Sequence, residues 1–217
     1  MPSANGWFEI LRSTFELLYF LAGIAIAFAA FRGLKQLQIT REIARTNAAR
    51  EALRFAAERC QYFAEYTVPA LTKMGIEYGR LGLKFLTTKS EWTVENGEII
   101  DHGFDMKLLV AELPRIEGLV VTYLNALEAF AIPFVAGVAD DSLGYQETAM
   151  AFCQDVKMAM PVFFHMRRSA RARYESTVKL YDVWNKRLVA SALAPAVKSL
   201  EDLTRTIEKE RIKPLGT

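Results

Sequence analysis

The clearest hydropathy pattern in the chain is an apolar run near its N-terminus. Nineteen residues, STFELLYFLAGIAIAFAAF, lie between Arg12 and Arg32, and Glu16 is their only charged residue. At about 1.5 Å per residue, this helix would extend roughly 28 Å, close to the roughly 30 Å hydrocarbon core of a bilayer. The sequence therefore predicts a transmembrane helix over 13–31, after a short N-terminus, 1–12. Glu16 is expected to pair with Arg12 at the membrane boundary.

A cleavable secretory signal peptide is the alternative for this run, since Ala25-Ile26-Ala27 resembles a cleavage site. The leading residues are not basic, however, because Glu9 and Glu16 accompany Arg12. The basic residues follow the run instead: Arg32, Lys35, Arg41, Arg45 and Arg50. This asymmetry favours an uncleaved anchor, with the N-terminus outside and the chain from residue 32 onward in the cytoplasm. We therefore predict a single-pass protein of a bacterial inner membrane.

Apolar residues beyond the membrane run recur at helical spacing. No glycine lies between Gly33 and Gly75, and Pro69 is the first proline after Pro2. The membrane helix is therefore expected to continue as a basic juxtamembrane stalk, 32–52. A regular apolar face begins at Leu53, which predicts a cytoplasmic helical bundle over 53–217. The predicted fold class is all-α: one transmembrane helix, a long stalk helix and the bundle.

Prolines, glycines and caps divide the predicted bundle. Pro114 is expected to kink or restart a helix within 104–130, and the break over 132–144, with Pro133 and Gly137, is predicted to be a turn. Asp140 or Asp141 is expected to cap the following helix. Pro161 is predicted to separate helices 145–160 and 162–193, with a last helix over 196–212. Asn96-Gly97 is a hairpin signal, but an isolated hairpin is marginally stable, so 92–101 is interpreted as a surface loop with at most a two-stranded excursion.

The composition excludes several classes of protein. The 217 residues are 52% hydrophobic and 24% charged, with two cysteines and a mean hydropathy of +0.09. A disordered chain, a collagen-like chain and a disulfide-rich secreted domain are all incompatible with these values. The net charge is only +2 and no recognition module is present, so nucleic-acid binding is not expected.

The charges are segregated along the chain. Residues 32–59 carry seven bases and three acids, 60–164 carry seven bases and fourteen acids, and 165–187 carry seven bases and two acids. The first basic block suits anionic lipid headgroups, through Arg32, Lys35, Arg41 and Arg45. The second block offers a patch for an anion or a protein partner: Arg167, Arg168, Arg171 and Arg173. The simpler interpretation is that this patch is a solvated helix face whose charges pair with the acidic segment 60–164.

Small residues in the membrane run offer a contact between two copies. Gly23 and Ala27 are four residues apart, a spacing that lets transmembrane helices approach closely. Self-association through this face is therefore one expectation. The stripe of Leu53, Ala56, Cys60 and Phe63 either continues the contact or faces its own bundle. Alanine is common in membrane helices, so the spacing alone does not establish a dimer.

Chemistry-bearing motifs are absent from the sequence. None of the short signatures of nucleotide-binding loops, serine hydrolases or zinc peptidases occurs. The two histidines, His102 and His165, have no partner at metal-binding spacing, so no metal or cofactor is expected. Cys60 and Cys153 fall on apolar stripes, where a buried and unreactive thiol is the common outcome. A cysteine–histidine pair formed in three dimensions stays open, but the expectation is a protein without enzymatic activity.

Three stretches resemble parts of bacterial single-span membrane proteins of families without known function. They are QLQITREIARTNAAREALRFAAERCQYFAEYTVPAL, YLNALEAFAIPFVAGVADDSLG and KLYDVWNKRL. The shared pattern is a membrane helix that runs into an Arg/Ala-rich helix, followed by an Asn-x-x-Glu helix and a Gly-x-x-Asp turn. The resemblance implies no activity and no catalytic residue. Asn125 and Glu128 are expected to bond each other or the turn at Gly137 and Asp140.

These patterns together predict a membrane-tethered helical interaction or effector module. Membrane lipids, a second copy and an unidentified protein are the expected partners. The alternative is a membrane-anchored sensor that binds an anionic ligand or a nucleotide through the basic segment after His165.

Overall fold

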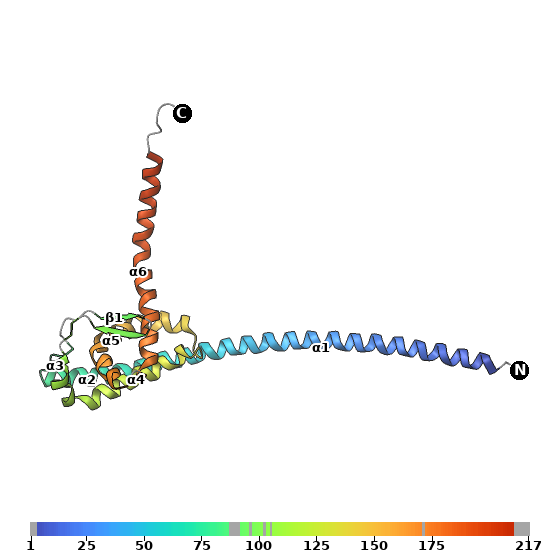
Figure 1. Ribbon diagram of the computed structural model, residues 1–217, viewed down its shortest axis with the longest axis horizontal. Coiled ribbons are helices and arrows are strands. Elements are labelled where there is room, and N and C mark those ends of the chain that lie inside the picture. Colours follow the sequence, from blue (N-terminus) through green and yellow to red (C-terminus); the bar gives the residue numbers. More distant parts are fainter. Residues whose placement is uncertain are drawn as a thin grey trace, which may run out of the picture. The chain divides into compact units, whose positions relative to one another are not determined.

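The computed structural model describes residues 4–86, 92–95, 97–101, 103–104, 106–170 and 172–210, and it confirms the all-α fold (Figure 1). The helices are α1 (Ala4–Tyr62), α2 (Val68–Arg80), α3 (Met106–Glu112), α4 (Glu117–Val135), α5 (Asp141–Ser169) and α6 (Glu175–Glu210). A π-helical turn (Phe63–Thr67) joins α1 to α2, and a 3₁₀ turn (Leu113–Arg115) follows α3. The chain divides into two units, Met1–Arg50 and Glu51–Thr217.

The first unit consists of most of α1. All of its side chains from Leu11 to Arg50 are exposed. An apolar window of this helix has a mean hydropathy of 1.9 and no buried residue, so it is long and apolar enough to cross a membrane. Arg12 Nε donates to Glu16 Oε1 at 3.1 Å, the pairing that the sequence predicted. Helix α4 is also apolar, with a mean hydropathy of 1.6, but it packs within the bundle.

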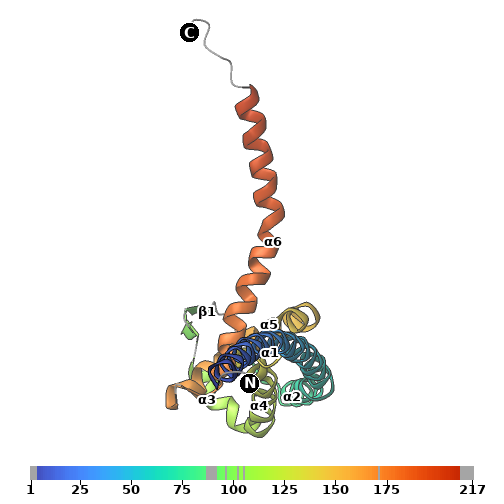
Figure 2. The same cartoon turned by 90° about the vertical axis from the view of Figure 1, so that its right-hand side faces the viewer.

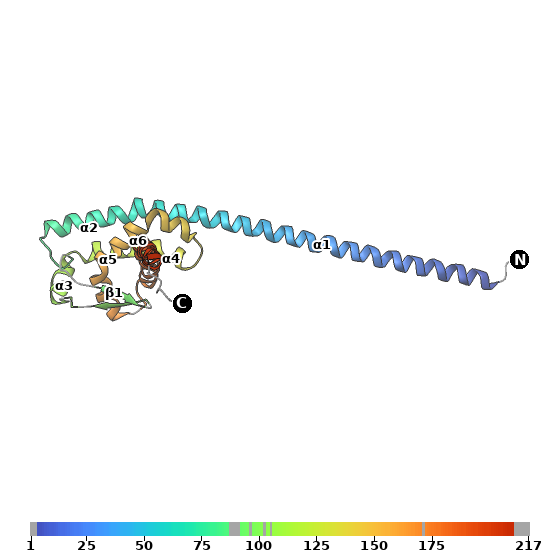
Figure 3. The same cartoon turned by 90° about the horizontal axis from the view of Figure 1, so that it is seen from above.

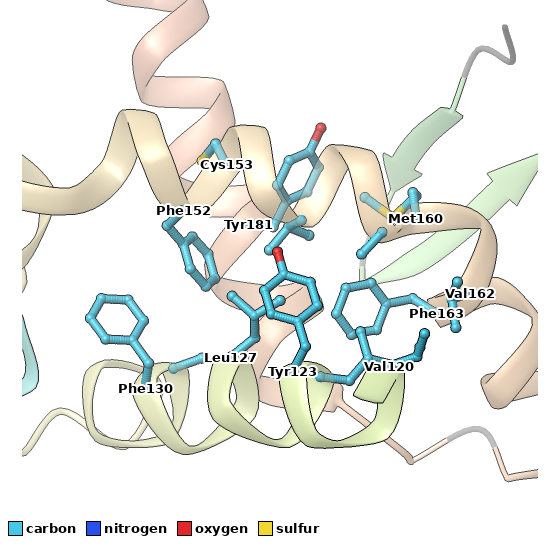
Figure 4. Packing of buried hydrophobic residues seen from close by; sticks show 14 of the residues in the cluster. Val120, Tyr123, Leu127, Phe130, Phe152, Cys153, Met160, Val162, Phe163 and Tyr181 are labelled. Carbon is cyan, nitrogen blue, oxygen red and sulfur yellow. The ribbon is translucent and has the colours of Figure 1, made fainter. Parts of the chain in front are cut away.

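The core of the second unit lies between α4, α5 and α6. Helix α4 packs on α2, α5, α6 and the π-helical turn. Figure 4 shows Tyr123 and Phe130 of α4 pointing toward α5, with Phe152 between the helices. The fully buried Trp184 ring of α6 lies 5.4 Å from Phe152 and 6.1 Å from Phe130. Large aromatic rings from three helices therefore form the centre of the bundle, where their burial stabilises it most.

The π-helical turn allows the chain to pass Pro69 without a break. A proline has no backbone N–H, and in a regular helix its ring would overlap the carbonyl of Glu65. Here Val68 N–H donates to Phe63 O, five residues back, and Pro69 occupies the first turn of α2. The wider turn places proline where its missing N–H is tolerated. Pro69 thus coincides with a change of helix geometry rather than an end.

Two predicted helix boundaries in the bundle were wrong. Pro161 lies inside α5 and Pro195 lies inside α6. Pro161 removes one backbone hydrogen bond, but the buried side chains around it, including Met160 and Phe163, hold the helix in place. The break comes instead between Ser169 and Glu175.

Two other predicted boundaries were confirmed. The 3₁₀ turn at Leu113–Arg115 separates α3 from α4 around Pro114. Asp140 caps α5, since its Oδ1 accepts a hydrogen bond from Leu143 N at 2.8 Å. Asp140 N also donates to Ala52 O at 3.0 Å, which ties the turn before α5 to the C-terminal part of α1.

The strands on either side of the predicted Asn-Gly turn form a hairpin that packs against the core. Strands β1 (Trp92–Glu95) and β2 (Glu98–Asp101) are antiparallel, with Trp92 opposite Asp101. Figure 3 shows the hairpin and α2 on opposite sides of the bundle. The Trp92 ring lies 5.6 Å from Phe104 and 5.4 Å from Phe164 of α5. The two-stranded excursion that the Asn-Gly signal allowed is present, and these contacts stabilise a hairpin that would be marginal alone.

Candidate functional site

The basic residues after the apolar run surround α1. Arg32, Lys35, Arg41 and Arg45 are all exposed, and the Arg32 guanidinium lies 5.5 Å from the centre of the Phe28 ring. At 100° per residue, Arg32 and Lys35 project to one side of the helix and Arg41 and Arg45 to the other. The second pair lies about 14–20 Å further along the axis than Arg32. Of the four, Arg32 and Lys35 lie nearest to the apolar run.

Gly23 and Ala27 lie on the exposed surface of α1. No atom lies within 4 Å of where a Gly23 Cβ would be. The face is therefore open along this helix, as a contact between two membrane helices requires.

Arg167 holds two chain segments together. Its Nη1 donates to Arg173 O at 3.0 Å and its Nη2 donates to Gly97 O at 3.1 Å. Burial lowers the pKa of this guanidinium, while the nearby carboxylates of Glu175 and Glu128 raise it. Arg167 thus joins the hairpin turn to the segment before α6, and two of its donors are already used.

The other residues of the predicted basic patch are dispersed. Helix α5 ends at Ser169, so a single helix does not carry the patch. Arg168 is exposed and lines two open hollows of about 140 and 400 Å³, one with Glu98 and Phe164 and the other with His165. Arg173 is exposed in the connection to α6, and Arg171 lies outside the described residues. Arg167 also lines the first hollow, so Arg168 is the exposed arginine that adjoins both of them.

The start of α6 is held by Glu128 of α4. Glu128 Oε1 accepts a hydrogen bond from Ser176 N at 3.1 Å. Its Oε2 accepts from Thr177 N at 2.8 Å and from Thr177 Oγ1 at 2.7 Å. Asn125 Oδ1 accepts from the Tyr174 hydroxyl at 3.3 Å. The expectation that Asn125 and Glu128 bond each other or the Gly137 turn was wrong, because both bind the N-terminal region of α6.

Asp141 connects the start of α5 to the middle of α6. Its Oδ1 accepts from Trp184 Nε1 at 2.7 Å, and its Oδ2 pairs with the Arg187 guanidinium. The same guanidinium lies 3.9 Å from the centre of the Tyr145 ring. Because Asp140 provides the cap, Asp141 is left to satisfy the buried indole. The sequence signal for this role was the second acidic residue of the Asp140-Asp141 pair.

The two thiols lie in apolar surroundings. Burial raises the pKa of Cys153 to about 12. Burial is also the main cause that raises the pKa of the half-buried Cys60. His165 shares α5 with Cys153, but twelve residues of helix place them about 18 Å apart. His102 lies outside the described residues. Neither thiol has the electropositive, accessible environment that lowers a cysteine pKa.

A carboxyl and a phenol lie near each other within the bundle. Tyr123 of α4 is fully buried, and its hydroxyl has no hydrogen-bond partner of normal geometry. Burial, with the neighbouring Asp155 of α5 as a second cause, raises its pKa. Burial raises the pKa of Asp155 to about 6, and the Tyr123 hydroxyl opposes part of this shift. Tyr123 is fully buried and Asp155 is partly exposed, so solvent reaches the carboxyl but not the phenol.

Among the residues whose placement the structure gives, no group of three or more histidines, cysteines or carboxylates is positioned to hold a metal ion. The geometry therefore offers an exposed apolar helix followed by basic residues, and a bundle whose polar clusters bind its own backbone and side chains. No known protein family, curated protein or solved structure matches the chain.

Proposed function

We propose that the chain is a membrane-tethered helical module that presents its bundle to a protein partner. The observation that carries the proposal is the α1 window with a mean hydropathy of 1.9 and no buried residue. A large apolar surface of this kind is covered in the native setting, and a bilayer is the cover that its length fits. In the bundle, the partly buried carboxylates of Glu128 and Asp141 join helices to one another.

The location follows from the charges that flank this window. Arg32 and Lys35 come directly after it, so the positive-inside rule places the bundle in the cytoplasm and the short N-terminus outside. A bacterial inner membrane is the proposed location.

The test is membrane fractionation of the intact chain. The chain is expected to stay with the membrane after an alkaline carbonate wash. The double variant Leu21→Arg, Ile24→Arg is expected to leave the membrane, because two charges at the centre of the span are costly. A wild-type chain that washes off would refute the tether. Reporter fusions at the C-terminus test the orientation, since alkaline phosphatase activity there, instead of green fluorescence, would reverse it.

Partner binding is tested by cross-linking in the native membrane. An interaction module should keep its cross-linked partner when Cys60, Cys153, His102 and His165 are all replaced. Loss of the partner in a folded variant would favour an enzyme whose reactive groups include these side chains.

A sensor of anionic ligands is the second candidate, favoured by the two hollows that Arg168 lines. The engagement of Arg167 with two backbone carbonyls weakens it, since few donors are left for a phosphate. The melting temperature of the chain in a panel of nucleotides tests this candidate. A rise that disappears in Arg168→Gln would support the sensor, and an unchanged melting temperature would remove it.

A further inference from the structure

The second half of α6 carries an apolar face outside the core. Leu188 is the last hydrophobic residue of α6 that packs against the core cluster. Beyond it, five apolar residues are 50–64% exposed: Val189, Leu193, Val197, Leu200 and Leu203. Figure 2 shows α6 continuing past the other elements of the bundle. Most of the stability of a helix in a protein comes from packing of its apolar face, so an exposed apolar face along this segment indicates a binding surface.

The spacing of this face is that of a coiled coil. Val189, Leu193, Ala196, Leu200 and Leu203 are separated by four, three, four and three residues, and Ile207 continues the series by four. This alternation is the heptad pattern, with a period of 3.5 residues, that packs one helix along another. We call the set from Val189 to Leu203 the α6 seam. The pattern favours a helix as the partner over a flat or irregular surface.

The charges on this half of α6 disfavour a bilayer as the occupant. Residues 189–210 contain three bases and four acids, and no aromatic residue. Helices that lie on anionic membranes have basic polar faces and commonly insert tryptophan or phenylalanine. A slightly acidic helix without aromatic residues lacks both attractions.

The residues that flank the seam are compatible with an identical helix. In a coiled coil these flanking positions set the choice of partner through their charges. Here they are Ala190, Ala192, Val197 and Ser199, all uncharged. Two copies of the seam therefore meet without like charges, and the apolar Val197 widens the contact. The charged residues Lys198, Glu201 and Asp202 project away from the seam, with both signs interspersed.

We propose that the α6 seam pairs with the same seam of a second copy of the chain. The inference rests on the proposed function in one respect, because a membrane tether confines the copies to a plane and raises their effective concentration. It adds a second site of self-association that is independent of Gly23 and Ala27 in α1.

The test is site-specific photo-cross-linking of the full chain in its native membrane. Benzoylphenylalanine is placed at Val197 beside the seam and, as the matched control, at Ala194 on the outer side of the helix. We expect a covalent dimer of the chain from Val197 and at least tenfold less from Ala194. Leu193→Glu should abolish the Val197 product, whereas Ala194→Glu, one residue away with the same added charge, should keep it.

Each other outcome overturns the proposal. An adduct with a different protein assigns the seam to that partner, an adduct with lipid assigns it to the bilayer, and no adduct leaves the seam without a second copy. Equal dimer yields from Val197 and Ala194 would show random collision. Release of the chain by the carbonate wash would refute the membrane tether but not the pairing of the α6 seam. The dimer adduct would then be sought in the soluble fraction.

Discussion

The carboxylate of Glu128 on α4 accepts two hydrogen bonds from Thr177 near the start of α6, one from its backbone N–H and one from its hydroxyl. Thr177 is fully buried. An acidic group from a neighbouring helix thus satisfies backbone donors that a helix N-terminus leaves unpaired, and its charge is favourable at the positive end of the helix dipole.

Removal of this cap should destabilise the bundle in two steps. Glu128→Gln keeps one acceptor but loses the charge, and we expect it to reduce the free energy of unfolding by about 1 kcal/mol. Glu128→Ala leaves the buried Thr177 donors unpaired, so the expected loss is about 2–3 kcal/mol. Thermal unfolding of the chain in detergent, followed by near-ultraviolet circular dichroism, measures both. Equal stability of the wild type and Glu128→Ala would show that water replaces the carboxylate.

Gly144 near the start of α5 should not tolerate a side chain. A Cβ at this position would overlap the ring of Phe134, which itself packs against Trp184 at 5.4 Å. Because that ring cannot move freely, we expect Gly144→Ala to destabilise the bundle by about 2 kcal/mol. Gly118→Ala is the matched control, since nothing lies within 4 Å of its Cβ position in α4. That control should be neutral or stabilising by up to about 1 kcal/mol.

The raised pKa of Asp155 predicts a pH dependence of stability. The folded state holds this proton until about pH 6, whereas the ordinary value of 3.8 applies to the unfolded chain. Stability should therefore fall as the pH rises from about 4 to about 6, by about 1 kcal/mol after allowance for the solvent that reaches the carboxyl.

Asp155→Asn should remove this loss and stabilise the chain by about 1 kcal/mol at pH 7. Urea unfolding at pH 4 and pH 7 is the measurement. Glu147→Gln, at an exposed position of the same helix, should change the free energy of unfolding by less than about 0.5 kcal/mol at both pH values. A destabilised Asp155→Asn variant would mean that the carboxylate has a partner that offsets its burial.

The orientation in the membrane should depend mainly on the two bases nearest the span. Arg32→Glu with Lys35→Glu should give part of the population an inverted orientation, detectable as alkaline phosphatase activity at the C-terminus. The same reversals at Arg41 and Arg45 should have a smaller effect, because these residues lie further from the membrane. A larger effect from the distant pair would contradict an upright helix at this position.

Local signals were sufficient for several features of the fold. The cap at Asp140 and the pairing of Arg12 with Glu16 depend on residues three or four positions apart, so the sequence shows both partners. The break before α6 could not be predicted in this way, since SARARY contains no glycine or proline. Tyr174 adopts a positive φ of 56° there, with its hydroxyl on Asn125 and its ring 5.5 Å from Phe163.

The candidate basic patch shows the same limit. Composition identified the arginines after His165, but it could not show that Arg167 would bind the carbonyl of Gly97, seventy residues earlier in the chain. Contacts of that kind depend on how the hairpin packs, which the Asn96-Gly97 signal did not specify. The sequence therefore identified the charged residues and missed which of them is used internally.

The bridge made by Arg167 has a consequence for local opening of the bundle. One guanidinium binds both the hairpin turn and the segment that leads into α6, so opening of either segment releases one bond of the side chain that also holds the other. Amide protons of β1, β2 and the first turn of α6 should then exchange with solvent at similar rates, as a single cooperative unit. The variant Arg167→Lys has no planar fork to span two carbonyls, so the amide protons of the two segments should then exchange at different rates.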